Sequence, residues 1–163
     1  MPPVALFLCG IPCSGKTTYA AQSRFDDYEY ICSEDFINSK MMEHGIDKAE
    51  ALLKYRSGIK KYIKRRIQET VAEGKSFILD QTNTYQSARI KKLKLIPEEY
   101  HKRAIYFILD YHDALKINDK RYQEEGNYTY PNLIKHFYDE YTYPSKKEGF
   151  DEVFGITVTF DEY

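Results

Sequence analysis

The sequence lacks four features that would assign it to a special class of protein. No apolar run approaches the roughly 18 residues that a membrane-spanning helix needs, and the first residues show no basic-then-apolar pattern of a signal peptide. Its three cysteines are an odd number without the spacing of metal ligands. The formal net charge is only −1, so bulk electrostatics give no attraction to nucleic acid. These absences favour an intracellular, cytoplasmic protein.

The composition is that of an ordinary globular protein. Of its 163 residues, 30% are charged and 42% are hydrophobic, which is enough to form a core. No internal repeat, low-complexity linker or shift in composition divides the chain. We therefore expect residues 1–163 to form a single domain.

Short apolar runs alternate with longer helical patterns along the chain. This alternation is typical of an α/β fold with a doubly wound parallel sheet of five strands and helices on both faces. One apolar stripe with three- and four-residue steps predicts a long helix over residues 47–73, which Gly74 ends. A further helix is expected over residues 131–141. The five predicted strands are Val4–Cys9, Tyr28–Cys32, Phe77–Asp80, Ala104–Leu109 and Phe154–Phe160.

Residues 10–17 read Gly-Ile-Pro-Cys-Ser-Gly-Lys-Thr and match the phosphate-binding loop pattern G-x-x-x-x-G-K-[ST]. The loop follows a predicted strand and precedes a helix-compatible stretch, as this motif requires. Backbone N–H groups then face phosphate, Lys16 reaches the β- and γ-phosphates, and the Thr17 hydroxyl binds Mg²⁺. The sequence thus predicts a P-loop NTPase fold of the kinase type that uses ATP and Mg²⁺. The expected nucleotide contacts are Gly10, Pro12, Cys13, Ser14, Gly15, Lys16, Thr17 and Thr18.

Ligands of such sheets bind at the carboxyl ends of the strands, so the residues that follow each strand are candidates for chemistry. Asp35 follows the second strand and is suited to orient an acceptor hydroxyl and take its proton. Glu34 is a rival carboxylate that spacing does not exclude, and a helix N-cap is the alternative interpretation of Ser33 and Asp35.

Asp80 ends the third predicted strand, where an acidic residue can organise the water shell of Mg²⁺. Thr82 and Asn83 follow within plausible reach of a substrate. The competing interpretation is turn chemistry, since Asx and Thr side chains often bond their own backbone.

Basic residues are found in three further segments. Lys116, Lys120 and Arg121 are predicted to lie on a helical lid that brings positive charge over the phosphates. Residues 60–66 and 91–94 could follow a nucleic-acid backbone. A solvated helix face explains all three equally well on sequence alone.

Together these motifs resemble the kinase domain of bacteriophage-type polynucleotide kinase and its small phosphate-loop relatives. The likeness spans nearly the whole chain and implies that Lys16, Asp35 and Arg121 are catalytic. The expected substrate contacts are Asp35, Asn38, Thr82, Asn83 and Arg89, and the expected metal residues are Thr17 and Asp80. Two positions depart from the family pattern: Asn38 stands where an arginine usually grips the substrate phosphate, and Ile117 stands where a second lid arginine would lie.

The expected function is an ATP-dependent kinase that transfers the γ-phosphate to a hydroxyl, with the 5′-hydroxyl of a polynucleotide as the first choice of acceptor. The departure at Asn38 leaves a nucleoside, a modified base hydroxyl in DNA or a small metabolite as alternatives. A nucleotide-binding regulatory ATPase is the rival from another class. The sequence does not distinguish DNA from RNA or ATP from GTP.

Overall fold

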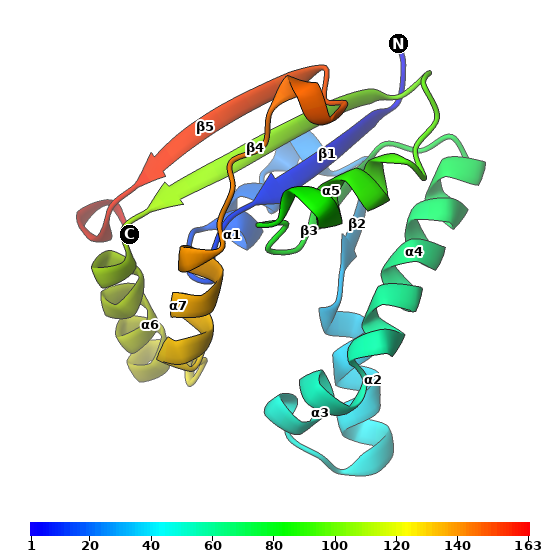
Figure 1. The fold of residues 1–163 in the computed structure, drawn as a ribbon. Helices are drawn as coiled ribbons and strands as arrows, with labels where there is room; N and C mark the ends of the chain where they lie inside the picture. The colour runs from blue at the N-terminus through cyan, green and yellow to red at the C-terminus, as the bar shows by residue number, and fades with distance from the viewer.

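The computed structural model describes residues 1–163 and has a five-stranded, all-parallel sheet at its centre (Figure 1). The strand order is β2-β3-β1-β4-β5. All five predicted strands are present, and the predicted parallel sheet is confirmed. Their bounds are β1 Val4–Cys9, β2 Glu29–Cys32, β3 Phe77–Asp80, β4 His101–Leu109 and β5 Glu152–Val158.

The register aligns the carboxyl ends of the strands that precede the candidate residues. Leu8 of β1 and Cys32 of β2 both pair with Asp80 of β3. The segments after these three neighbouring strands therefore leave the sheet at one edge. This edge gathers the phosphate loop, the start of α2 and the turn after β3.

Helices cover both faces of the sheet, as the doubly wound fold predicts. The helices are α1 Lys16–Ala20, α2 Glu34–His44, α3 Lys48–Lys54, α4 Arg56–Ala72, α5 Gln86–Leu93, α6 Tyr111–Glu125 and α7 Pro131–Asp139, with short 3₁₀ turns η1 Ser23–Phe25, η2 Lys146–Glu148 and η3 Phe160–Glu162. On one face, Ile63 and Ile67 of α4 and Leu93 of α5 pack on the strands. On the other face, Tyr19 of α1 and Phe25 of η1 do so. None of the helices is long and apolar enough to cross a membrane.

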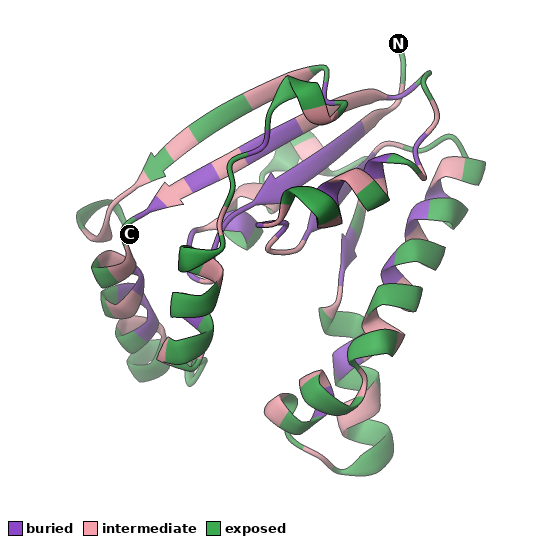
Figure 2. Cartoon of the chain, viewed as in Figure 1, coloured by how far each residue is buried: buried purple, intermediate pink, exposed green.

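The central strands form the most buried part of the molecule. The last five residues of β1 and all four residues of β3 are buried, and Figure 2 shows this as a band through the middle of the sheet. Edge strand β5 has no buried residue. Beyond the carboxyl ends, α6 and α7 form one lobe, while α2, α3 and the start of α4 extend as another (Figure 1).

The predicted helix over residues 47–73 is in fact two helices. The backbone leaves the helical conformation at Tyr55, with φ −108° and ψ 22°, between α3 and α4. Asp47 caps α3 by accepting a 2.8 Å hydrogen bond from the N–H of Glu50. The break lets α3 contact α2 as well as α4, which a single straight helix could not do. The helix predicted over residues 131–141 begins as expected and ends two residues earlier, at Asp139.

Candidate phosphoryl-transfer site

The phosphate loop curls between β1 and α1 in the way its sequence requires. Gly15 has a φ of 90°, and Cys13 also lies in the left-handed region with a φ of 73°. The Lys16 ammonium group donates hydrogen bonds to the carbonyl oxygens of Gly10, at 2.8 Å, and Ile11, at 2.9 Å. Burial lowers the pKa of Lys16 to about 8, because desolvation penalises its charged form. The loop thus surrounds its own lysine with carbonyl oxygens.

Three side chains from separate elements meet beside the loop. The Thr17 hydroxyl donates a 2.8 Å hydrogen bond to Oδ2 of Asp80, and the Tyr30 hydroxyl donates to the same oxygen. Burial, followed by the bond to Asp80, raises the pKa of Tyr30. Hydroxyl and carboxylate oxygens are the ligands that Mg²⁺ prefers, so the donor set of Thr17 and Asp80 fits this ion. The sequence did not predict a role for Tyr30, because no motif around this residue of β2 indicates a contact with Asp80, which is 50 positions away.

The start of α2 presents the two rival carboxylates differently. Ser33 is the N-cap residue, but its side chain makes no capping hydrogen bond. Glu34 is engaged in a 2.8 Å ion pair with Lys48 of α3, whereas Asp35 is exposed and forms no ion pair. Asn38 is also exposed and lies three residues after Asp35, on the same side of the helix. Asp35 and Asn38 are therefore both open to solvent.

The turn after β3 divides into an accessible and an inaccessible part. Thr82 is half-buried, and its carbonyl oxygen accepts a 2.8 Å hydrogen bond from the N–H of Gly10. Asn83 is buried with a φ of 45°, and its side-chain amide donates to the carbonyl of Leu8 at 2.8 Å while its oxygen accepts from Lys92 at 2.6 Å. Asn83 thus joins the turn to β1 and α5, and the acceptor contact expected of its side chain stays a prediction.

Arg89 is also inaccessible in the structure. Its side chain is fully buried and pairs with Glu148 at 2.7 Å. It also donates to the carbonyl oxygens of Asn83, at 2.9 Å, and Thr142, at 2.8 Å. These partners occupy its guanidinium group in the structure, and the substrate contact expected of Arg89 stays a prediction. The residue ties α5 to the turn after β3, to the segment at Thr142 and to η2.

Arg121 of α6 lies across from the phosphate loop. Its Nη1 is 3.7 Å from Sγ of Cys13, and it shares a pocket of about 350 Å³ with the loop. Glu125, Asn127 and Tyr163 complete this pocket, and no sequence motif had singled them out. Ile117, at the place of a second lid arginine, is fully buried in a cluster with Ile11 and Ile134.

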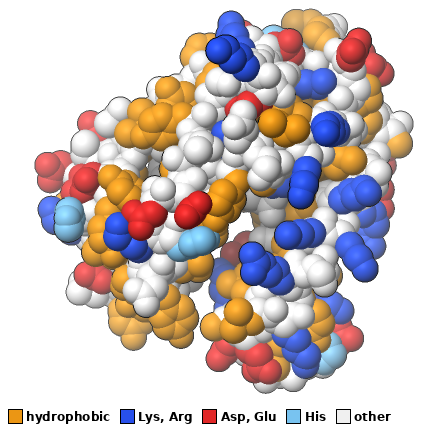
Figure 3. All heavy atoms as spheres, in the orientation of Figure 1, with side chains coloured by type: hydrophobic (Ala, Val, Ile, Leu, Met, Phe, Trp, Pro, Cys, Tyr) orange, Lys and Arg blue, Asp and Glu red, His pale blue; other side chains and the backbone are white.

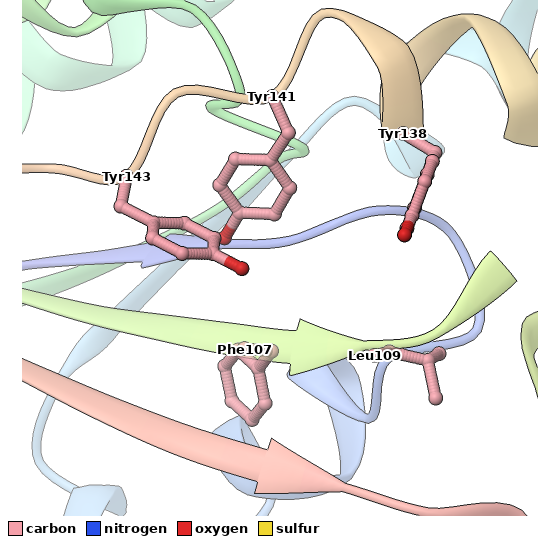
Figure 4. Close-up of a pocket in the computed structure, with 5 residues that line it drawn as sticks. All are labelled: Phe107, Leu109, Tyr138, Tyr141 and Tyr143. Atoms are coloured by element: carbon pink, nitrogen blue, oxygen red, sulfur yellow. The ribbon is translucent and has the colours of Figure 1, made fainter.

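A second hollow, of about 220 Å³, lies at the end of β4 and is entirely aromatic and aliphatic. Figure 4 shows Tyr138, Tyr141 and Tyr143 on one side of β4 and Phe107 on the other. The Tyr141 hydroxyl donates a 2.8 Å hydrogen bond to the carbonyl of Cys9, just before the phosphate loop. The tyrosine is thus a support for the loop, and burial raises its pKa.

The fold and the site together define a class. A parallel sheet with a phosphate loop after β1 and an acidic residue on the neighbouring β3, bonded to the loop threonine, is a kinase-type P-loop protein. Residues 6–134 match the family model AAA_33, described as an AAA domain, and the chain belongs to this family.

Solved structures share this fold at low sequence identity. A candidate kinase from Chloroflexus aurantiacus superposes with a TM-score of 0.74 and 14% identity, over 99% of this chain and 88% of that one. A chain of the Pnkp1/Rnl/Hen1 RNA repair complex gives a TM-score of 0.66 and 22% identity, over 85% of this chain and 44% of that one. A gluconokinase from Sinorhizobium meliloti (TM-score 0.59, 14% identity, over 98% of this chain and 89% of that one) has the same fold. This chain therefore shares its fold with a candidate kinase, a gluconokinase and a chain of an RNA repair complex.

A curated human relative is the heterogeneous nuclear ribonucleoprotein U-like protein 2. It is 24% identical over 156 residues, which are 91% of this chain and 21% of that protein. This chain therefore spans about a fifth of the relative's length.

Proposed function

We propose that this protein is a kinase that transfers the γ-phosphate of ATP to the 5′-hydroxyl of a polynucleotide. The observation that carries the proposal is the meeting of three strand ends. The phosphate loop, Asp80 and the helix start with Asp35 follow β1, β3 and β2, which are neighbours in the sheet. A nucleotide and an acceptor bound at this edge would lie side by side, as direct phosphoryl transfer requires.

The residues of the chain supply the parts that this reaction needs. The loop N–H groups and Lys16 bind the phosphates of ATP and offset their charge. Thr17 and Asp80 would hold Mg²⁺, which when bound neutralises charge on the phosphate oxygens. Arg121 approaches the phosphates from α6 and stabilises the charge that spreads over the transferred group.

Asp35 orients the acceptor hydroxyl and accepts its proton. The preference for Asp35 over Glu34 rests on their contacts, because Lys48 occupies Glu34 while Asp35 has no partner. A carboxylate without a partner is free to accept a hydrogen bond from an incoming hydroxyl.

The polynucleotide acceptor is supported by the sequence around Asp35 and by the Asp-Gln-Thr-Asn segment, which resemble those of polynucleotide kinases. The likeness of fold to a chain of an RNA repair complex agrees with it. A second candidate, a nucleoside or a small metabolite, is favoured by Asn38, which offers no cation to a substrate phosphate.

The test is transfer of labelled γ-phosphate from ATP to a single-stranded 5′-hydroxyl oligonucleotide. We expect label on the oligonucleotide with the wild-type protein and none with Lys16→Ala. Asp35→Asn should lose about 100-fold or more in the rate of transfer while still binding ATP, and Glu34→Gln is its matched control. Transfer to nucleosides or sugars, with none to the oligonucleotide, would replace this proposal with the second candidate.

A further inference from the structure

The basic residues of this nearly neutral chain are unevenly distributed. Residues 51–68 contain seven lysines and arginines and no acidic residue, and residues 81–97 contain four and again none. These two segments form most of α3 and α4 and all of α5. The whole chain has 24 basic and 25 acidic residues. Outside these two positively charged segments, acidic residues therefore outnumber basic ones.

The helix periodicity decides which side of α4 each cation occupies. Ile63 and Ile67 mark the buried stripe. Arg66 lies on one flank of this stripe, where it pairs at 3.2 Å with Glu29 of the edge strand β2. At 100° per residue, Lys60 and Lys64 fall on the opposite flank, one helical turn apart. This flank faces away from the β2 edge, toward the side of the sheet face that α5 covers.

Most of these cations have no acidic partner in the structure. Lys60, Lys61, Lys64, Lys91 and Lys94 form no ion pair, although ten of the chain's other lysines and arginines do. Like charges at positions i and i+4 of a helix destabilise it, and Lys60 and Lys64 are such a pair. A solvated helix face would not need to keep this repulsion, whereas an anionic ligand would relieve it.

The unpaired cations lie on a helix that packs beside the acceptor site. Tyr62, which at 100° per residue lies on the Arg66 flank of α4, contacts Phe36, the residue after Asp35, with ring centroids 5.4 Å apart. Figure 3 shows lysine and arginine side chains gathered over α4 and α5 on one face, next to the hollow between the two lobes. A strand whose 5′ end reaches Asp35 could leave the site by crossing α4 from the flank of Tyr62 to the flank that carries Lys60 and Lys64.

We propose that Lys60, Lys64 and Lys91 bind the phosphodiester backbone of a single-stranded acceptor, beyond its 5′-terminal nucleotide. This inference rests on the proposed function and extends it from one hydroxyl to a length of strand. Asn38 stands where related kinases have an arginine that binds a substrate phosphate. Lysines at this surface would supply that positive charge instead. Because such contacts ignore the bases, binding should depend on strand length and salt rather than on sequence.

The experiment compares a dinucleotide with a 5′-hydroxyl strand of about 20 nucleotides in the labelled-phosphate assay, using wild-type protein and Lys60→Glu/Lys64→Glu. The matched control is Lys146→Glu/Lys147→Glu, which makes the same change of charge at exposed residues of η2. We expect wild-type kcat/KM to be higher for the long strand. The α4 variant should lose about tenfold or more on that strand, and its log–log salt slope should fall by about 1.4 for two lost phosphate contacts.

The possible failures are distinct. If the α4 variant and the η2 control keep the same preference for the long strand and the same salt slope, the lysine surface is not the path of the strand. If wild-type protein phosphorylates neither acceptor, the proposed function itself fails. An equal loss on both acceptors in the α4 variant would reveal damage to the site or to folding, and would also overturn the inference.

Discussion

Thr17 and Asp80 are 63 positions apart in the chain, yet the hydroxyl of one donates a 2.8 Å hydrogen bond to the carboxylate of the other. The bond joins the first turn of α1 to the end of β3. It brings together two oxygen ligands that suit Mg²⁺, and Tyr30 holds the same carboxylate oxygen from β2.

Weakening this cluster should change the requirement for Mg²⁺. Asp80→Asn removes the negative charge of the carboxylate. We therefore expect the rate of phosphate transfer to fall by about 100-fold, and the Mg²⁺ concentration that gives half the maximal rate (the Mg²⁺ midpoint) to rise. Tyr30→Phe removes only a bond that orients the carboxylate and should raise the midpoint by about tenfold. A Mg²⁺ titration of phosphate transfer measures both effects, with Asp139→Asn on α7 as a control. An unchanged midpoint in Asp80→Asn would exclude this residue from the metal site.

Nucleotide affinity should depend on pH through Lys16. Its pKa in the free protein is about 8, so the side chain is charged below this pH and neutral above it. We expect ATP affinity to be flat below pH 8 and to fall by about tenfold per unit above it, because binding must then take up a proton. Calorimetry in buffers of different ionisation enthalpy would detect that proton. Burial also lowers the pKa of Lys92 to about 8, but Lys92 bonds Asn83 rather than the loop. Lys92→Met should therefore keep the fall of ATP affinity above pH 8, and Lys16→Ala should lose it.

Arg89 should matter to stability. Arg89→Met leaves the carboxylate of Glu148, which is 1% exposed, buried without its cation, and we expect a loss of about 3–5 kcal/mol in the free energy of unfolding. Adding Glu148→Met removes the unpaired charge and should recover much of that loss. Urea denaturation of the two variants measures the difference. If the single variant unfolds like the wild type, the buried pair is not what holds these segments together.

Gly58 should control the fit between α4 and α2. A Cβ added there would lie 2.8 Å from Cζ of Phe36, which neighbours Asp35. Gly58→Ala should therefore destabilise the protein by about 1–3 kcal/mol and raise KM for the acceptor with no change in ATP affinity. Ser57→Ala, at the adjacent exposed position, is the control. Equal effects on both substrates would argue against a link between this contact and the acceptor site.

The sequence predicted the number, approximate bounds and parallel arrangement of the strands, because each central strand is a short apolar run and the phosphate loop fixes the first βα unit. It did not predict the break at Tyr55, where no glycine or proline marks an end and the apolar stripe continues across the turn. The burial of Arg89 was also out of reach, since its partner Glu148 lies 59 residues away. For the same reason Tyr30 was missed: its importance comes from a neighbouring strand.

Ile117 has a consequence for how this protein can evolve. The side chain is fully buried among Ile11, Ala114 and Ile134, so an arginine there would place an unpaired charge in the core at a cost of several kcal/mol. That is a large part of the stability of about 5–15 kcal/mol typical of a whole protein. A lineage with this core could acquire a second arginine at that position only after the surrounding residues had changed. With the present core, Arg121 is therefore the one of these two positions that accommodates an arginine.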